Sequence, residues 1–91
     1  MEPVEIHQIE GFDPRNRMFN RNISVYRKER SFSAQLSYEE LFLESPHYPT
    51  PGEAVRELVK LVVGEKFSRI RTRLNFKGKK YLTELEPWIE F

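Results

Sequence analysis

The clearest helical periodicity in this chain covers residues 51–63, and alternating patterns flank it on both sides. The stretch TPGE opens this segment as a capping box, with Thr50 at the N-cap, Pro51 at N1 and Glu53 at N3. Gly64 follows where a left-handed residue commonly ends a helix. One short helix between alternating segments predicts an α+β domain, in which an antiparallel sheet carries the helix on one face.

Three strands are expected before this helix. VEIHQI at 4–9 alternates and is typical of a short edge strand, which could also pair across a dimer. Residues 11–22 hold Gly, Pro and Asn and are predicted as a loop, so that 1–22 is loosely ordered. Segments 23–28 and 31–38 alternate again and predict a hairpin.

Residues 39–49 are compatible with either a continued strand or a helical turn, before the prolines force an extended connection. After the helix, residues 69–76 alternate between an apolar face and an arginine face. A helical pattern also fits this segment, but β-branched and aromatic residues favour a strand. With 77–80 as a turn and 81–86 as the return strand, the predicted order is β-β-β-α-β-β.

The 91 residues are enough for one domain, 1–91, with a modest core. Hydrophobic residues make up 38% of the chain and aromatic residues 13%, which argues against overall disorder.

The segment 66–80, KFSRIRTRLNFKGKK, is the most unusual in charge, because seven of its fifteen residues are basic and none is acidic. A turn at 77–80 pairs Phe76 with Tyr81. On the outer face it then sets Arg73 against Glu84, Arg71 against Glu86 and Arg69 against Trp88. Opposite charges facing across strands stabilise a sheet by roughly 0.2–1 kcal/mol per pair. The favoured interpretation is therefore a partly neutralised structural face.

The alternative interpretation of the same stretch is a nucleic-acid-binding surface. Several cations on one face with aromatic residues nearby suit phosphates and unpaired bases. The candidate residues are Arg69, Arg71, Arg73, Lys77, Lys79 and Lys80. Arg15, Arg17 and Arg21 would join them if the loop folds that way. No recognition motif accompanies the charge, so the signal is general.

The carboxy-terminal EPWIEF concentrates apolar side chains. Trp88, Ile89 and Phe91 either fold back over the helix to complete the core or form an exposed anchor for a protein partner. The leading functional hypothesis is a protein–protein adaptor or accessory subunit, a monomer or weak homodimer, whose partner is unknown. A nucleic-acid-binding domain is the alternative.

The composition gives no support to an enzyme. There is no cysteine, and the two histidines, His7 and His47, are forty residues apart. No nucleophile elbow or phosphate loop occurs, so no catalytic residue, cofactor or metal is expected. The amino terminus has no apolar signal region and the longest apolar run is Leu61–Val63, so a cytoplasmic protein without membrane contact is expected.

Two resemblances bear on the fold. The stretch from PTPGEAVRELVKLV through FSRIRTRLNFKGKKYLTELEPWIEF resembles the tails of small uncharacterised cyanobacterial proteins, which implies no function. The strands followed by YPTPGEAVRELVKLV resemble the strand–turn–helix of HicB-type antitoxins. That second resemblance implies a dsRNA-binding-like α+β fold and a toxin or nucleic-acid partner.

Overall fold

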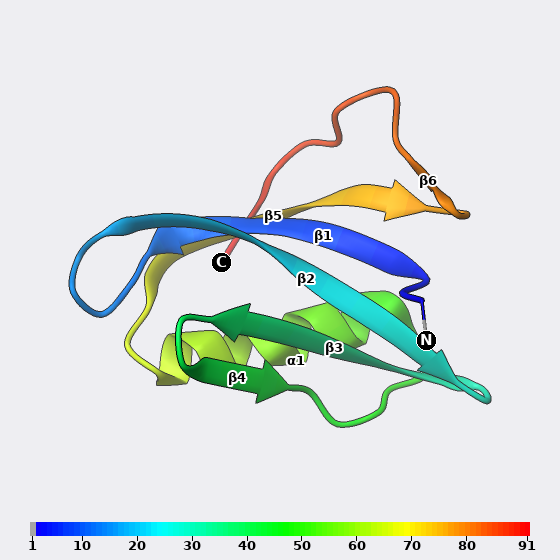
Figure 1. Cartoon of the computed structure of the whole chain (residues 1–91), viewed down its shortest axis with the longest axis horizontal. Coiled ribbons are helices and arrows are strands. Elements are labelled where there is room, and N and C mark those ends of the chain that lie inside the picture. Colours follow the sequence, from blue (N-terminus) through cyan, green and yellow to red (C-terminus); the bar gives the residue numbers. More distant parts are fainter. Residues whose placement is uncertain (1) are drawn as a thin grey trace.

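The computed structural model describes residues 2–91 (Figure 1). This part of the chain contains seven strands and one helix. They are β1 (Glu5–Phe12), β2 (Met18–Lys28), β3 (Ser31–Tyr38), β4 (Leu41–Glu44), α1 (Pro51–Gly64), β5 (Ser68–Lys77), β6 (Lys80–Tyr81) and β7 (Ile89–Glu90). All pairings are antiparallel in the order β4-β3-β2-β1-β5-β6, and β7 also pairs with β5. An antiparallel sheet with one helix is confirmed, but the predicted element order is wrong, because there are four strands before the helix and three after it.

The amino-terminal strand lies in the middle of the sheet, and its prediction as an edge strand is wrong. β1 pairs with β2 on one side and with β5 on the other. The expected loop at 11–22 shrinks to residues 13–17, because pairing continues up to Phe12 and Met18. Asn20 and Asn22 lie on β2 between buried Phe19 and Ile23 and are exposed, so they belong to the solvent face of a strand, whereas Asn16 lies in the turn. The part of 1–22 from Glu5 onward is thus mostly paired strand; Met1 is outside the described residues.

Asp13 explains how the β1–β2 turn can be so short. Its Oδ1 accepts hydrogen bonds from the backbone N–H groups of Arg15, at 2.9 Å, and Arg17, at 2.8 Å. Its Oδ2 accepts from the Arg17 side chain and from the Tyr38 hydroxyl, each at 2.7 Å. An aspartate that satisfies the backbone donors of a turn replaces the hydrogen bonds that a longer loop would need from water.

The hairpin predicted for 23–28 and 31–38 is confirmed as β2 and β3. Residues 41–44 continue the sheet as β4, which pairs with β3 and settles the ambiguity at 39–49 in favour of a strand.

Helix α1 begins as predicted, with the Thr50 hydroxyl accepting a hydrogen bond from the Glu53 N–H at 3.2 Å. It ends at Gly64, one residue later than expected, and the left-handed residue that follows it lies two residues later than expected. The left-handed residue is Lys66, with φ of 72°, and not Gly64. The N–H of Lys66 bonds to the Val63 carbonyl and the N–H of Phe67 to the Val62 carbonyl, which together form a Schellman motif.

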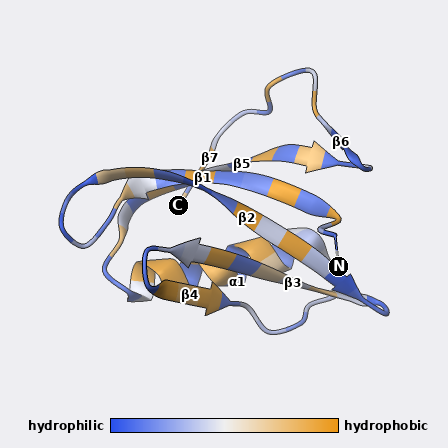
Figure 2. Ribbon diagram, in the orientation of Figure 1, coloured by the Kyte–Doolittle hydropathy of each residue, from blue (hydrophilic) through white to orange (hydrophobic). Residues whose placement is uncertain are grey.

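The core lies between α1 and one face of the sheet, and Figure 2 shows the hydrophobic residues of the helix and strands. The buried helix residues are Ala54, Val55, Leu58, Val59 and Val62. They form one cluster with strand residues such as Ile23, Val25 and Leu36, and α1 lies chiefly over β3. At the end of the helix, Phe19, Tyr38 and Phe67 pack edge to face, with ring centroids 5.2–5.3 Å apart. The opposite face of the sheet carries no helix.

The long return strand predicted for 81–86 does not form. Phe76 pairs with Tyr81 as predicted, but β6 ends there, and the chain leaves the sheet through residues 82–88. It returns as β7, where Glu90 pairs with Arg71 and Ile89 with Thr72. Pro87 has no N–H to give to a ladder, which disfavours an uninterrupted strand through it.

Candidate nucleic-acid interface

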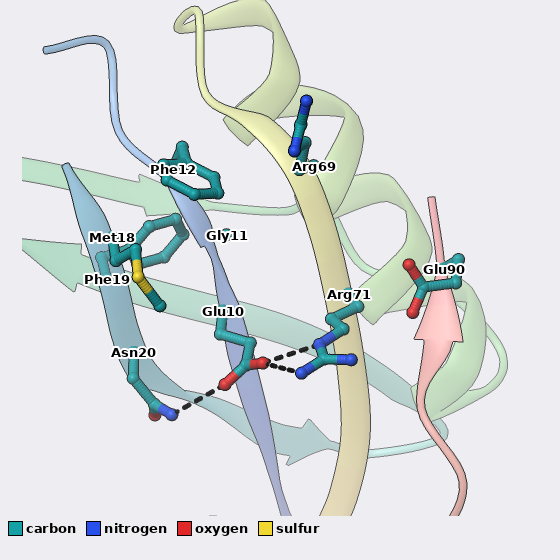
Figure 3. Close-up of a pocket in the computed structure, with 9 residues that line it drawn as sticks. All are labelled: Glu10, Gly11, Phe12, Met18, Phe19, Asn20, Arg69, Arg71 and Glu90. Atoms are coloured by element: carbon teal, nitrogen blue, oxygen red, sulfur yellow. Dashed lines mark hydrogen bonds and ion pairs between the residues drawn. The ribbon is translucent and has the colours of Figure 1, made fainter. Parts of the chain in front are cut away.

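The arginines of β5 contact β1 rather than the predicted glutamates. Arg71 donates from Nε to Glu10 Oε1 at 2.6 Å, and its Nη2 pairs with the same oxygen (Figure 3). Arg73 donates from Nε to Gln8 Oε1 at 3.0 Å. Because β1 is central, its polar residues lie beside β5. The expected pairs of these arginines with Glu84 and Glu86 are therefore wrong, although the face is partly neutralised.

Trp88 lies against two of these arginines. The Cζ atoms of Arg71 and Arg73 are 4.3 and 4.2 Å from its ring centroid. The predicted contact of Trp88 with Arg69 does not form, because β7 pairs with β5 in a register shifted from that of the turn. A cation–π contact at such distances stabilises the pair by about 0.5–1 kcal/mol where it is exposed.

Arg69 leaves the arginine stripe at a β-bulge. Its φ is +51°, and the pairing with β1 shifts register between Glu10 and Phe12. A Cβ on Gly11 would be 2.7 Å from the Ser68 carbonyl oxygen, so only glycine fits opposite the bulge. The Arg69 Cζ is 5.9 Å from the Phe12 ring centroid.

Residues of this bulge line a hollow on the surface of the sheet (Figure 3). Arg69 and Arg71 line it together with Glu10 and Glu90. Two cations and two carboxylates balance one another there. Of the three arginines, Arg71 is thus neutralised by an ion pair with Glu10, whereas Arg73 donates to the neutral Gln8 and Arg69 has no ion pair in residues 2–91.

The three remaining residues, Lys77, Lys79 and Lys80, lie in or beside the β5–β6 turn and are exposed. Gly78 and Lys79 both have φ of +66°, and Lys77 pairs with Lys80, which defines a two-residue hairpin turn of the I′ kind. Within residues 2–91 no carboxylate forms an ion pair with any of these lysines. The turn thus presents three unneutralised positive charges.

A second basic turn lies at the same end of the molecule. The β2–β3 turn carries Arg27, Lys28 and Arg30, all exposed and without an ion pair in the described chain. The start of β1 explains this placement, because Glu5 pairs with both Val25 of β2 and Lys77 of β5. Figure 1 shows both turns at one end of the long axis.

We call this set the basic end: Arg27, Lys28, Arg30, Lys77, Lys79 and Lys80. Glu29 is the one carboxylate within the two turns. A hollow beside the β5–β6 turn is lined by apolar residues such as Val4, Phe32 and Pro51, by Lys77 and Lys79, and by the carboxylates Glu2 and Glu5. Sequence reasoning missed the β2–β3 turn, whose basic residues were visible only as a polar connection.

The arginines expected to join the lysines lie elsewhere. Arg15 and Arg17 belong to the β1–β2 turn, which is at the opposite end of the sheet from the basic end. Arg17 pairs with Asp13 and Glu39, and Arg21 lies over the Tyr38 ring at 4.8 Å from its centroid. This cluster stabilises the turn and does not extend the basic surface.

Among the carboxyl groups of the described chain, Asp13 is the one whose pKa departs far from its ordinary value. Burial alone would raise the pKa of Asp13, but hydrogen bonds from the Tyr38 hydroxyl, from Arg17 and from the backbone of Arg15 lower this pKa to about 2. The hydrogen bond to Asp13, followed by burial, raises the pKa of Tyr38. Both oxygens of this buried carboxylate therefore accept hydrogen bonds.

The carboxy terminus does not fold over the helix. β7 pairs with β5, and the Phe91 N–H donates to the Ile70 carbonyl at 2.9 Å. Four large apolar side chains of this carboxy-terminal segment remain exposed, by 59% for Tyr81, 78% for Leu85, 58% for Ile89 and 48% for Phe91. We call these four residues the edge strip. Of the anchor residues expected, Ile89 and Phe91 are in it, whereas Trp88 is half-buried under the arginines.

Both histidines have local partners. His7 Nε2 is 2.7 Å from Glu5 Oε1, a pair that two-residue spacing along a strand brings to one face, and His47 Nδ1 is 3.3 Å from Ser31 Oγ. Residues 2–91 hold no cluster of three or more His, Cys, Asp or Glu side chains that would suit a metal ion. In that same part of the chain, no helix has the length and apolar character needed to cross a bilayer.

Comparison of the chain with protein-family models, with curated proteins and with solved structures finds no match to any of them.

Proposed function

We propose that this protein binds nucleic acid through the basic end, contacting the phosphate backbone without catalysis. The observation that carries the proposal is the convergence of two hairpin turns, which hold six exposed cations with no ion pair in residues 2–91. Phosphate binding depends on such free cations, because each contact releases condensed counterions.

The chemistry of the basic end favours backbone contacts over base recognition. Lysine is a point charge that contacts phosphate without reading bases, and four of the six cations are lysines. Two aromatic rings near the β5–β6 turn, those of Trp88 and Phe76, have partners already. Trp88 lies against two guanidinium groups, and Phe76 packs edge to face on Tyr81 at 5.1 Å. Stacking of unpaired bases is therefore a minor contribution, and a duplex is the favoured ligand.

Fluorescence anisotropy with a labelled duplex and a labelled single strand of the same length tests this proposal. We expect the wild type to bind the duplex with a dissociation constant of about micromolar at low salt, and to bind more weakly as salt rises. Two variants each remove the three positive charges of one turn: K77S/K79S/K80S for the β5–β6 turn and R27S/K28S/R30S for the β2–β3 turn. Each should weaken binding and reduce the slope of log K against log salt, by about 0.9 for every phosphate that the protein no longer neutralises.

A charge-matched control keeps the test specific. R15S/R56S/K66N removes three exposed cations outside the basic end, none of which forms an ion pair in the described chain. Unchanged affinity in this variant supports a local site. An equal decrease in affinity in all three variants would mean that overall charge alone attracts the ligand, and would overturn the proposal.

A second candidate function, a protein–protein contact, is favoured by a separate observation. The edge strip exposes four large apolar side chains beside a strand of only two residues. Exposed apolar surface at an open sheet edge is typical of a site that receives another strand. An adaptor or accessory subunit would use this surface.

A further inference from the structure

We propose that a hollow on the open face of the sheet binds one unpaired nucleotide at the end of a duplex, with a preference for a base that carries an exocyclic amino group. This inference rests on the proposed function, because two cations of the basic end line the hollow, which has a volume of about 370 Å³. Pockets for small ligands span about 300–1,000 Å³. We call it the Ser33 hollow, and its main lining residues are Tyr26, Arg27, Lys28, Ser33, Gln35 and Glu44.

The strand register places the Ser33 hollow on the side of the sheet that carries no helix. Tyr26 pairs with Ser33, and Gln35 pairs with Glu44. Because Ala34, between Ser33 and Gln35, belongs to the core under α1, these four side chains point to the opposite face. Ser33 is the small side chain among larger ones and forms the floor of the hollow.

The Ser33 hydroxyl is the group that points to a ligand. Ser33 is only 4% exposed, yet its hydroxyl has no hydrogen-bond partner within residues 2–91. In this part of the chain no fully buried side-chain oxygen or nitrogen lacks a partner, so the hydroxyl opens into the hollow. A nearly buried donor without a protein partner is satisfied when a ligand accepts its hydrogen bond.

Three kinds of chemical group follow one another along the hollow. Lys28, which pairs with Ser31, lies at the end nearest the β2–β3 turn. The Tyr26 ring lies one step further, and Gln35 and Glu44 lie at the next step. Each step is two residues, or about 6–7 Å along a strand. A nucleotide presents its phosphate, the plane of its base and the edge of its base in the same order.

The Tyr26 ring is available for stacking on a base. Tyr26 is half-buried, and no aromatic ring or guanidinium group of the described chain packs on its ring. Stacking of a base on an aromatic side chain is tolerant of sequence. One free ring accepts one base, so the phosphate contacts of the basic end still provide most of the affinity.

Gln35 and Glu44 favour a base with an amino group. Gln35 Nε2 donates to Glu44 Oε2 at 2.7 Å, which orients the carboxylate and leaves Oε1 to accept from a ligand. A carboxylate accepts a hydrogen bond from the N4 amino group of cytosine. Uracil has a carbonyl oxygen in that place, which would face the carboxylate oxygen. Cytosine is therefore preferred over uracil.

Fluorescence anisotropy tests the inference with a blunt duplex and with duplexes that carry one unpaired deoxycytidine or deoxyuridine at the 3′ or the 5′ end. In one of these two polarities, the wild type should bind the deoxycytidine end about tenfold more tightly than the blunt duplex. It should prefer this end to the deoxyuridine end by about fivefold. Equal affinity for the blunt duplex and all unpaired ends would overturn the inference and leave the proposed function intact.

Variants of the hollow locate the bound base, and affinity ratios within one protein cancel general effects of charge. S33A should melt no lower than the wild type, because no protein hydrogen bond is lost, and should reduce the gain from the unpaired end by about fivefold. E44M removes the acceptor and should bind both unpaired ends equally. The control E40M makes the same change at an exposed carboxyl outside the hollow and should keep both ratios. Wild-type ratios in S33A and E44M would contradict a base in this hollow.

NMR titration of the full chain with cytidine monophosphate tests the hollow without a duplex. The backbone amide signals of Tyr26, Ser33 and Glu44 should shift, and the nucleotide should lower the affinity for the deoxycytidine end to that for the blunt duplex. No shift at these residues would overturn the hollow as a nucleotide site. Shifts in a protein that binds no duplex would overturn both the proposed function and the unpaired end, and would identify the free nucleotide as the ligand.

Discussion

Asp13 shows how one residue determines a local structure that composition does not reveal. The sequence around it, rich in Gly, Pro and Asn, predicted a twelve-residue loop. Its carboxylate instead accepts four hydrogen bonds and closes the turn after five residues. Phe19 and Ile23 are both buried in β2, but the exposed Arg21 between them breaks the alternation, so the sequence of this stretch did not indicate a strand.

The pKa of Asp13 leads to a prediction for acid stability. Because this pKa falls from the ordinary 3.8 to about 2 in the folded protein, the ionised carboxylate stabilises the fold fully above pH ~4. That contribution is lost as the pH drops from 4 toward 2. Melting temperatures measured across this range should fall for the wild type.

Asp13→Asn should melt lower at neutral pH and show a flatter decline below pH ~4. Glu40→Gln, which changes an exposed carboxyl in no ion pair of the described chain, serves as the control and should keep the wild-type decline. If Asp13→Asn declines as steeply as the wild type, the low pKa assigned to this carboxyl is wrong.

Gly11 is the second residue whose identity the fold requires. Its Cβ would clash with the backbone of β5 at the bulge, at 2.7 Å from the Ser68 carbonyl oxygen. We expect Gly11→Ala to lower the free energy of unfolding by about 1–3 kcal/mol, as overpacked sites do.

Chemical denaturation measures this change. Gly52→Ala is the matched control, since an added Cβ there meets nothing within 4 Å. Equal stability of the two alanine variants would show that β1 and β5 can move apart at the bulge.

At the scale of elements, helix α1 was the easiest to predict, because the capping box and the apolar periodicity are both local. Its end was misplaced for a reason that is not local. Phe67 is buried against the core and draws the chain into the Schellman turn through Lys66, which overrides the preference of Gly64.

Gly64 is consequently an unneeded glycine within the last turn of α1. A Cβ added there meets no atom within 4 Å, and the residue does not have a positive φ. Gly64→Ala should therefore raise the free energy of unfolding by about 0.5–1 kcal/mol. A loss of stability in denaturant unfolding would mean that Gly64, and not Lys66, ends the helix.

The β5–β7 region shows what alternation cannot predict. It correctly placed Arg71 and Arg73 on one face of β5 and paired Phe76 with Tyr81, but it missed the bulge at Arg69. It could not reveal which strand lies on the other side of β5. Because β1 occupies that position, Arg71 contacts Glu10 and Arg73 contacts Gln8. The sequence had assigned both arginines to the carboxy-terminal glutamates.

At the scale of the whole molecule, topology creates the candidate surface. The β2–β3 and β5–β6 turns are almost fifty residues apart in the sequence, yet both lie beside the start of β1. Charge counted along the sequence identified only the β5–β6 turn. The positive surface therefore depends on β1 being the central strand, a long-range property that local patterns do not specify.

The most direct test of the central claim is the salt dependence of duplex binding in the wild type and in the variant that lacks all six cations of the basic end. We predict measurable binding by the wild type at about 50 mM salt, weakening steeply toward 200 mM, and no binding by the variant. Undiminished binding by the folded variant, or no binding by the wild type even at low salt, would contradict the account.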